Sequence, residues 1–360
     1  MWAGDAFRER FGLSYPIVQA PMAAISLADL VAAVSEAGGL GSLGSATLSA
    51  EQIGEEVRKI RARTQRPFAL NFFLHAPPRL DEARLAQLTQ RLAGYRAELG
   101  VHDEPVFKVP PPFDAAMLEC VLALKPAAVS FHFGVPDRAV LDALKRAGIY
   151  VMASATHVKE AQLLEQAGLD AIVAQGVEAG GHRGTFAVPY AQGELGLLSL
   201  LPQVVDSVRV PVIAAGGIAD GRGIAAALTL GAAAVQLGTL FLATPEALID
   251  PIYRRTLFEP RAAETRVTKL WTGRPARAIV TRYLDEMRAY EDEMLEFPLQ
   301  RVLSLQLDRS ALAKDSPEFH AMWAGQNASR LRALPAAQLL EALAAETVEA
   351  MRAGQSRVGA

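Results

Sequence analysis

Short apolar runs recur along the chain from residue 16 to residue 242. Most of them are separated by segments in which apolar residues recur every three or four positions, which is the period of an amphipathic helix. In the first such segment, Leu27, Leu30, Val31 and Val34 form one apolar stripe. The pattern predicts alternating strands and helices, with eight strands at 16–21, 39–44, 68–74, 127–134, 150–155, 171–177, 210–217 and 234–241.

The turns that end several of the predicted helices are alike. Gly38, Gly148, Gly168 and Gly231 each follow a helical segment and precede a strand-like run. Glycine is favoured directly after a helix because this position often takes a left-handed backbone conformation. Strands that are apolar nearly throughout and alternate with helices are typical of a parallel sheet covered on its outer face. Eight such units over about 230 residues predict a closed (β/α)₈ barrel, the TIM barrel fold.

Two regions depart from this rhythm. Residues 75–126 contain two helical patterns joined by a proline-rich connection, so we expect additional structure there. After residue 245 the chain becomes charged and mostly helical. We therefore predict a barrel domain at 1–246, a mostly helical lobe on the substrate side at 247–335, and a C-terminal helix at 336–360 that packs back on the barrel.

Composition and charge narrow the range of partners. The chain of 360 residues is 51% hydrophobic and has a formal net charge of −3. It has no positive excess that would attract nucleic acid or an anionic membrane. The charged N-terminus lacks a signal-like apolar core, so we expect a cytoplasmic protein. The single cysteine, Cys120, lies in a helical pattern and cannot form an internal disulfide.

Residues 39–44 match the G-x-G-x-x-G pattern of dinucleotide-binding proteins. That fingerprint must follow a strand and open a helix, so that the pyrophosphate meets the helix N-terminus. Here the glycines follow a helix and belong to a strand. We interpret them as residues that let this strand lie close to a ligand or to the barrel interior.

Barrel enzymes carry their chemistry at the carboxyl ends of the strands, and the last two strand ends often bind phosphate. The seventh predicted strand ends in Gly216 and Gly217. The eighth ends in Gln236, Leu237, Gly238 and Thr239. Glycines let backbone N–H groups approach a phosphate, and a hydroxyl at the start of a helix adds a donor. No Walker loop is present, so we expect the phosphate of a bound cofactor or sugar.

The remaining strand ends supply amides, hydroxyls and a thioether. Amide groups can bond the edge of a flat heteroaromatic ring, and methionine packs on its face. This set is typical of a flavin site. The candidate residues are Gln19, Ala20, Pro21, Met22, Asn71, His132, Ser154 and Gln175.

The sixth strand leads into Gly180 and Gly181, followed by His182. The glycine pair lets the chain wrap against a cofactor and presents His182 at the open mouth, where a neutral imidazole can take a proton from substrate. The alternative is a histidine that only bonds a loop carbonyl. His132 is a candidate on the substrate side or an ordinary interior histidine. We expect no metal site, because no third ligand has suitable spacing to these two histidines.

Several of these motifs together resemble a known family. The segments QAPMA (19–23), GGLGSLG (38–44), SFHFG (130–134), QGVEAGGHRG (175–184), AAGGIADG (214–221) and TGRPAR (272–277) resemble the class I FMN-dependent nitronate monooxygenases, formerly called 2-nitropropane dioxygenases. The resemblance implies FMN, held at positions that include Met22, Asn71, Gln175, Gly180 and Gly217. It implies that His182 is the catalytic base. It also implies oxidation of alkyl nitronates, such as propionate 3-nitronate, by O2 without NAD(P)H, a role in nitroalkane detoxification.

Three alternatives remain. A flavin-dependent enoyl-acyl-carrier-protein reductase shares the barrel and a similar EAGGH turn but uses NAD(P)H. A barrel similar to IMP dehydrogenase would need a loop cysteine, whereas Cys120 lies in a predicted helix. A cofactor-free barrel that binds phosphosugars would have no redox activity. In each case the partner is a small molecule, and we expect a monomer or a small homo-oligomer.

Overall fold

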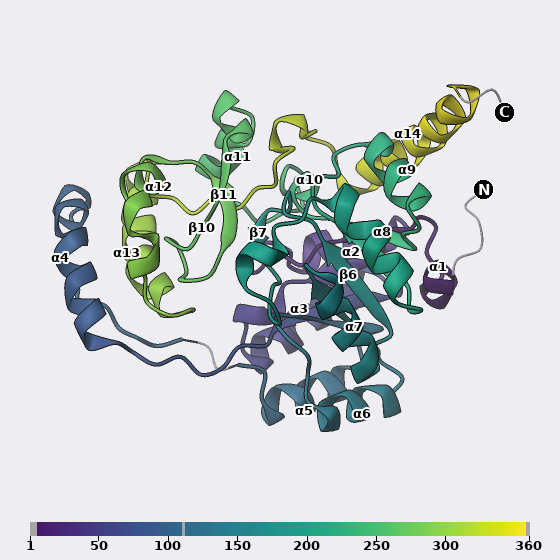
Figure 1. The fold of residues 1–360 in the computed structure, drawn as a ribbon, viewed down its shortest axis with the longest axis horizontal. Helices are drawn as coiled ribbons and strands as arrows, with labels where there is room; N and C mark the ends of the chain where they lie inside the picture. The colour runs from purple at the N-terminus through teal and green to yellow at the C-terminus, as the bar shows by residue number, and fades with distance from the viewer. Residues whose placement is uncertain (1–5, 110–111, 358–360) are drawn as a thin grey trace.

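The computed structural model describes residues 6–109 and 112–357, and it contains a closed parallel barrel (Figure 1). The eight strands follow the order β1-β9-β8-β6-β5-β4-β3-β2, and every pair is parallel. A bridge between Val18 and Leu40 joins the two ends. The predicted (β/α)₈ barrel is confirmed, and all eight strands lie within the predicted runs. They are β1 (Ile17–Gln19), β2 (Gly41–Leu43), β3 (Phe68–Phe73), β4 (Ala128–His132), β5 (Tyr150–Ala155), β6 (Ala171–Gln175), β8 (Val212–Ala215) and β9 (Ala234–Leu237).

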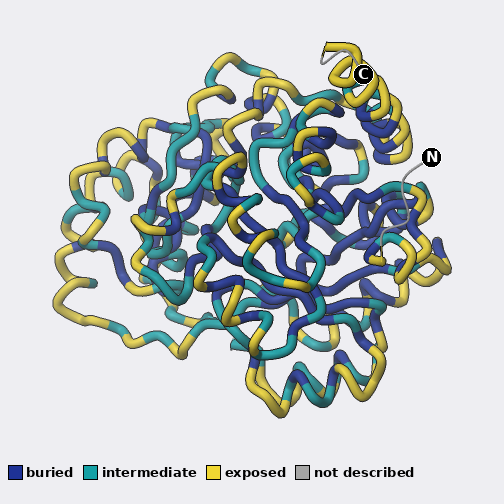
Figure 2. The backbone as a smooth tube through the Cα atoms, turned by 45° about the vertical axis from the view of Figure 1, so that its right-hand side comes forward, coloured by how far each residue is buried: buried dark blue, intermediate teal, exposed yellow. Residues whose placement is uncertain are grey.

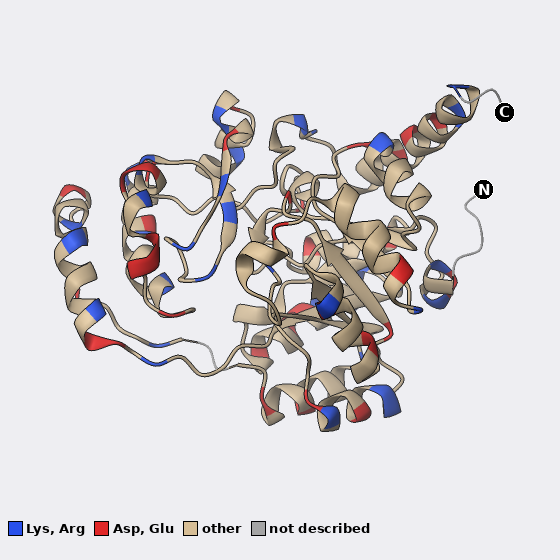
Figure 3. Ribbon diagram, in the orientation of Figure 1, with Lys and Arg blue, Asp and Glu red and all other residues tan. Residues whose placement is uncertain are grey.

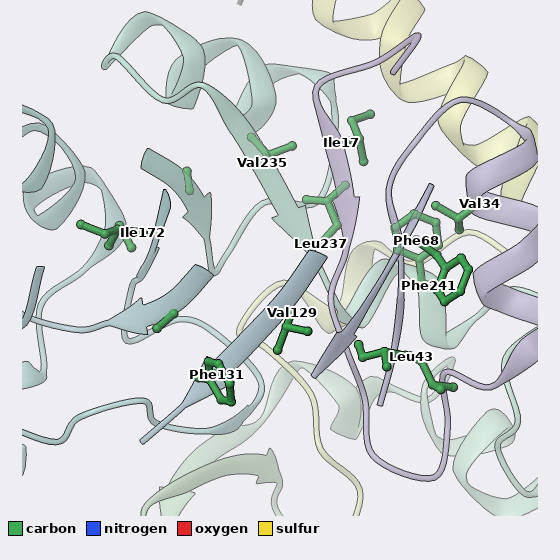
Figure 4. Packing of buried hydrophobic residues seen from close by; sticks show 14 of the residues in the cluster. Ile17, Val34, Leu43, Phe68, Val129, Phe131, Ile172, Val235, Leu237 and Phe241 are labelled. Carbon is green, nitrogen blue, oxygen red and sulfur yellow. The ribbon is translucent and has the colours of Figure 1, made fainter. Parts of the chain in front are cut away.

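Helices surround the barrel and bury the outward side chains of its strands. Residues such as Ile17, Val129 and Ile172 pack against the helices in one continuous apolar cluster (Figure 4). Neighbouring residues such as Val18 and Met152 point inward, because successive side chains of a strand face opposite sides. The surrounding helices are α2 (Ala28–Glu36), α3 (Ala50–Arg63), α5 (Ala115–Leu124), α6 (Arg138–Arg146), α7 (Val158–Ala167), α8 (Leu197–Ser207), α9 (Gly221–Thr229) and α10 (Thr239–Leu242).

The two ends of the barrel differ, because one is closed by a helix and the other is open. At the amino end of the strands, α1 (Ala6–Phe11) closes the interior, where Phe7 and Phe11 pack edge-to-face on each other and join the inward cluster. The tube in Figure 2 shows this buried centre enclosed by partly exposed helices. The carboxyl end is the side on which the site described below opens.

Glycines act as expected at the helix ends. Gly38, Gly148, Gly168 and Gly231 have φ values of 92°, 76°, 94° and 95°. These are left-handed conformations, which residues with a Cβ adopt only at a cost. The sequence therefore located the turns that return the chain from helix to strand.

The glycines of segment 39–44 serve helix packing. A Cβ on Gly41 would collide with the Val31 carbonyl of α2, and one on Gly44 would collide with the Met22 backbone. These glycines thus bring β2 close to α2 and to the preceding loop. For Gly41 the expected approach to the barrel interior was wrong, because this glycine faces the covering helix; the expected closeness of the segment to a ligand stays a prediction.

The lobe is mostly helical, but it also holds a small antiparallel sheet. Its strands are β10 (Thr265–Thr268), β11 (Ala276–Ile279) and β7 (Gly181–His182), in the order β10-β11-β7. Because β7 belongs to the turn after β6, this sheet ties the lobe directly to the barrel mouth. The lobe helices are α11 (Pro251–Thr256), α12 (Arg282–Glu286) and α13 (Gln300–Ala313), with 3₁₀ turns η3 (Pro260–Ala263), η4 (Arg288–Glu293) and η5 (Ala328–Arg330).

The additional segment after β3 joins the lobe. It forms α4 (Glu82–Leu99), whose Leu88 and Leu92 pack in one apolar cluster with Trp271 and Tyr283 of the lobe. Figure 1 shows α4 beside α13, with the barrel on the other side. The predicted domain boundaries stay a prediction, and the structure adds that residues distant in sequence share the lobe core.

The C-terminal helix α14 (Ala336–Arg357) lies against the barrel helices. Its Leu339, Leu340 and Leu343 are fully buried in the main apolar cluster. The Glu346 carboxylate accepts a hydrogen bond from the Gly221 N–H at the start of α9. Within the part of the chain that the structure describes, no helix is long and apolar enough to cross a membrane.

Candidate active site

A cavity of about 510 Å³ opens at the carboxyl ends of the strands, between the barrel and the lobe. Apart from Gln19, the residues that the sequence analysis proposed as catalytic, substrate-side or cofactor-binding line it, and so does the candidate Ser154. Their individual roles stay predictions. They are Ala20, Pro21, Met22, Asn71, His132, Gln175, Gly180, Gly181, His182, Gly216, Gly217, Gln236, Leu237, Gly238 and Thr239.

Gln19 is the exception among the wider set of candidates. Its side chain is fully buried, and its Oε1 accepts a hydrogen bond from the Ser42 N–H at 2.9 Å. It does not line the cavity, whereas its neighbour Ala20 does. Alternation along the strand explains the difference, because adjacent residues cannot face the same side. Gln19 therefore couples β1 to β2.

His182 lies on β7, at the junction of barrel and lobe. Its Nε2 is 2.9 Å from the Thr272 hydroxyl, which can also donate to the Arg274 carbonyl at 3.2 Å. In that arrangement the hydroxyl accepts from Nε2–H, and Nδ1 is free to take a proton. The imidazole is surrounded by the rings of Phe297 and Trp323, with centroid separations of 5.3 and 5.5 Å.

This environment keeps the imidazole neutral. Burial, and then the charges of His132, Arg274 and Arg301, lower the pKa of His182 to about 3. Desolvation disfavours the cationic form of histidine, and no carboxylate among the described cavity-lining residues offsets it. At neutral pH His182 is therefore in the protonation state that a base requires.

His132 holds the backbone of His182. Its Nε2–H donates to the His182 carbonyl at 3.1 Å, which fixes the tautomer of the His132 ring. Burial, only partly opposed by this hydrogen bond, lowers the pKa of His132 to about 3. The same carbonyl accepts from Gln175 Nε2 at 3.0 Å. The two side chains together set the position from which His182 projects.

Arg183, the residue after His182, forms hydrogen bonds that hold the turn after β6 in place. It is almost fully buried, and its NH1 donates to Gln175 Oε1 at 3.0 Å. Its NH2 donates to the Gln175 and Gly193 carbonyls, each at 3.0 Å. Because Gln175 Oε1 also accepts from the Gly184 N–H at 2.8 Å, the amide of Gln175 can take one orientation only. Its Nε2 is thereby directed to the His182 carbonyl.

The sequence analysis predicts a phosphate site at the ends of β8 and β9. Gly216 and Gly217 have left-handed φ values of 115° and 68°. Among the described residues, no partner accepts a hydrogen bond from either N–H group. The Thr239 hydroxyl accepts from the Gly325 N–H at 2.9 Å and keeps its own proton for another acceptor. Unpaired backbone donors at a left-handed glycine turn are typical of an anion site.

The sequence analysis missed the wall that the lobe supplies. These residues come from loops and helices with no recognisable motif, and only the TGRPAR segment at 272–277 pointed to this region. Figure 3 shows both Lys and Arg and Asp and Glu on the lobe elements. The missed lining residues on this side include His75, Lys108, Tyr253, Thr272, Phe297, Arg301, Leu305 and Trp323, and Phe73 of the barrel strand β3 was missed as well.

Cys120 is not part of the site. It lies on α5, where its thiol donates to the Ala50 carbonyl at 3.5 Å. Burial raises the pKa of the thiol, so the nucleophilic thiolate is disfavoured. The structure gives no support to a barrel chemistry that depends on a loop cysteine.

The model of the family described as "Nitronate monooxygenase" matches residues 6–346. The chain belongs to the nitronate monooxygenase family. It is 42% identical to a nitronate monooxygenase of Pseudomonas aeruginosa, over 95% of this chain and 99% of that protein. It is 44% identical to one of Paraburkholderia phytofirmans, over 93% of each chain. The resemblance inferred from the motifs is confirmed, and this member of the nitronate monooxygenase family is an enzyme.

Solved structures agree with the assignment. A nitroalkane oxidase from Streptomyces ansochromogenes superposes with a TM-score of 0.88 at 42% identity, covering 95% of this chain and 98% of that one. FabK from Thermotoga maritima superposes with a TM-score of 0.78 at 29% identity, covering 99% and 100%. The combination of barrel and lobe is therefore shared by proteins with different names.

Proposed function

We propose that this member of the nitronate monooxygenase family is FMN-dependent and oxidises alkyl nitronates of the propionate 3-nitronate type with molecular oxygen, without NAD(P)H. One observation carries the proposal. A neutral imidazole, His182, lies in an aromatic part of the cavity lined by described residues that include no carboxylate. Such a cavity suits an anionic substrate and a base that acts at neutral pH.

The barrel side of the cavity fits FMN. The unpaired N–H groups of Gly216 and Gly217 can bind its phosphate, and the Thr239 hydroxyl can add a further donor. The amides of Asn71, within β3, and Gln175, at the end of β6, line the cavity, where they can bond the edge of the flavin ring. FMN, when bound, supplies the electron transfer between substrate and oxygen.

The protein's own residues orient the substrate and move a proton. For a neutral nitroalkane, the free ring nitrogen of His182 removes the proton from the carbon that bears the nitro group. A preformed nitronate has already lost that proton, so it needs His182 only for orientation. His132 and Gln175 support this step by holding the His182 backbone.

Anaerobic mixing tests the proposal. We expect a nitronate alone to bleach the flavin absorbance of the holoenzyme rapidly, and added O2 to restore it. NADH and NADPH should reduce the flavin slowly or not at all. Fast reduction by a nicotinamide, with none by a nitronate, would overturn the proposal.

The similarity to FabK favours one second candidate, an NAD(P)H-dependent enoyl-acyl-carrier-protein reductase. The same mixing experiment separates the two functions, because the reductase needs a nicotinamide and the monooxygenase does not. Colourless protein that binds no FMN would instead favour a non-redox phosphosugar-binding barrel. A cytoplasmic location and a monomeric or small homo-oligomeric state stay predictions from the sequence.

Replacing Gly217 by valine tests the phosphate site. A valine at φ 68° is strained, and its Cβ would lie 3.0 Å from the Glu178 Cβ. We expect FMN content after purification to fall at least about tenfold, because the turn can no longer present its N–H groups. Flavin absorbance per protein measures the effect.

Gly100→Val is the matched control. Gly100 has a similar φ of 70°, ends α4, and has no atom near its missing Cβ. Both variants carry a backbone cost of roughly 1–2 kcal/mol. Only the Gly217 variant should lose FMN. Equal retention by both would rule out a phosphate role for the Gly217 turn.

A further inference from the structure

The lobe contributes the charge of the cavity. The described lining residues include two permanent cations, Lys108 and Arg301, and neither Asp nor Glu. Lys108 is exposed at the rim, whereas Arg301 is about two-thirds buried, with 31% of its side chain accessible. A charge in a partly desolvated position discriminates ligands more strongly than one in open solvent, since water screens it less. Arg301 is therefore the cation best placed to select a substrate.

Arg301 lies on the part of the lobe that faces His182. It belongs to the first turn of α13, four residues after Phe297, whose ring contacts the His182 imidazole at 5.3 Å between centroids. Val302 and Leu305 of the same helix also line the cavity. The charge of Arg301 is close enough to contribute to the lowered pKa of His182. A small substrate bound at His182 would thus lie between the imidazole and Arg301.

A series of buried ionic hydrogen bonds holds the Arg301 side chain in place. Its NH2 donates to Asp308 Oδ2 at 2.5 Å, and Asp308 Oδ1 accepts from His320 Nδ1 at 2.5 Å. His320 Nε2 donates to Asp250 Oδ2 at 2.9 Å. Asp308 and His320 are both buried. This series engages the guanidinium through NH2 alone.

Several N–H donors of the Arg301 guanidinium have no partner among the described residues. Its only other hydrogen bond among the described residues is a long one, 3.4 Å from NH1 to the Ser304 hydroxyl. A guanidinium has five N–H donors in a planar fork that matches a carboxylate. Most of the donors of Arg301 are therefore available to a ligand. The apolar neighbours Leu305 and Phe297 leave room for a short alkyl chain between the two ends.

We propose that Arg301 is a specificity-determining residue that binds a carboxylate at the far end of the substrate, so that the enzyme prefers carboxylated nitronates to simple alkyl nitronates. This inference rests on the proposed nitronate oxidation. The enzyme thereby selects a substrate with two negative charges. His182 and the barrel side bind the nitronate end, and Arg301 of α13 binds the carboxylate end.

The test compares two substrates of nearly equal shape in the holoenzyme. Propionate 3-nitronate has a carboxylate where propyl-1-nitronate has a methyl group. In Arg301→Met we expect the ratio of their kcat/KM values to fall about 10- to 100-fold, mostly through KM of the carboxylated substrate. Arg301→Lys should recover part of the loss, because it keeps the charge but not the fork.

Arg309→Met is the control, since Arg309 is an exposed arginine on the same helix. Its ratio should equal that of the unaltered enzyme. Each ratio is measured within one protein, so a loss of folded enzyme cancels. An unchanged ratio in Arg301→Met would overturn the inference, and so would a loss confined to Lys108→Met. A loss of FMN from Arg301→Met would assign the arginine to the cofactor and also overturn it.

A binding measurement separates failure of the inference from failure of the proposed function. Turnover of propyl-1-nitronate with no preference for the carboxylated substrate would contradict the inference alone. If the unaltered enzyme oxidises neither nitronate, the proposed function fails. Calorimetric titration of the holoenzyme with 3-nitropropionate still tests Arg301 in that case, with weaker binding to Arg301→Met expected and equal binding contradicting the inference.

Discussion

His182 in the barrel mouth is half-buried and His320 in the lobe is buried, yet their pKa values move in opposite directions. Burial lowers the pKa of His182 to about 3. Burial would also lower that of His320, but hydrogen bonds and charges from Asp250 and Asp308 outweigh it and raise the pKa to about 9. The barrel mouth therefore contains a neutral imidazole, and the lobe contains a charged one.

The difference lies in the partners of the two rings. His182 contacts aromatic rings and a hydroxyl, whereas His320 lies between two carboxylates. A buried imidazole stays charged only where an anion compensates its lost hydration. A neutral ring such as that of His182 can accept a proton. A charged ring such as that of His320 can take part in the ionic contacts that support Arg301.

The largest expected effect concerns the unpaired histidine. His182→Ala should keep FMN and the fold but slow turnover of neutral nitroalkanes by roughly 10²- to 10⁴-fold, because the base is lost. Preformed nitronates should be affected far less. Steady-state kinetics with a nitroalkane and its own nitronate measure both effects, with the exposed His102→Ala as control. Equal losses on the two substrates would contradict proton abstraction by His182.

The pH dependence sharpens the same comparison. Because the pKa of His182 is about 3, the imidazole is already deprotonated throughout the neutral range. In the unaltered enzyme, kcat/KM for a neutral nitroalkane should therefore show no inflection near the ordinary histidine pKa of about 6.5. An inflection at that value, lost in His182→Ala, would show that the base is not desolvated as described.

A smaller effect, on stability, is expected for the paired histidine. The pKa of His320 is raised in the folded protein, so its contribution is complete below the unfolded value of about 6.5 and is lost as pH rises through about 9. His320→Gln should lower the free energy of unfolding by roughly 2–3 kcal/mol at about pH 6. The difference should shrink towards pH 10.

Urea denaturation at the two pH values measures this, with His102→Gln as the exposed control. A difference between the unaltered protein and His320→Gln that is the same at both pH values would show that the ring is not a stabilising cation. Arg301, Asp308 and Asp250 remain in the variant, so the experiment isolates the titration of the ring.

Much of the barrel could be predicted from local patterns. Apolar runs marked the strands, and glycines such as Gly38 and Gly168 marked the helix ends, because each depends on residues close in sequence. The positions at the strand ends could be predicted as well, since a parallel barrel brings all of these ends to one rim. His182 and Gly217 were found in this way.

The lobe side could not be predicted in the same manner. Thr272, Phe297, Arg301 and Trp323 are far from the barrel motifs in sequence and follow no repeating unit. Gln19 shows the converse error: it lies beside a cavity residue, but strand alternation turns it away.

The sequence by itself determined the barrel, its order of strands and helices, and the chemistry gathered at its mouth, because these follow from local periodicity and the topology it imposes. Only the tertiary structure decided which nitrogen of His132 carries its proton, that His182 is neutral while His320 is charged, and that Arg301 lines the same cavity as His182. These properties depend on burial and on the distances between residues far apart in the chain, and no local pattern encodes them.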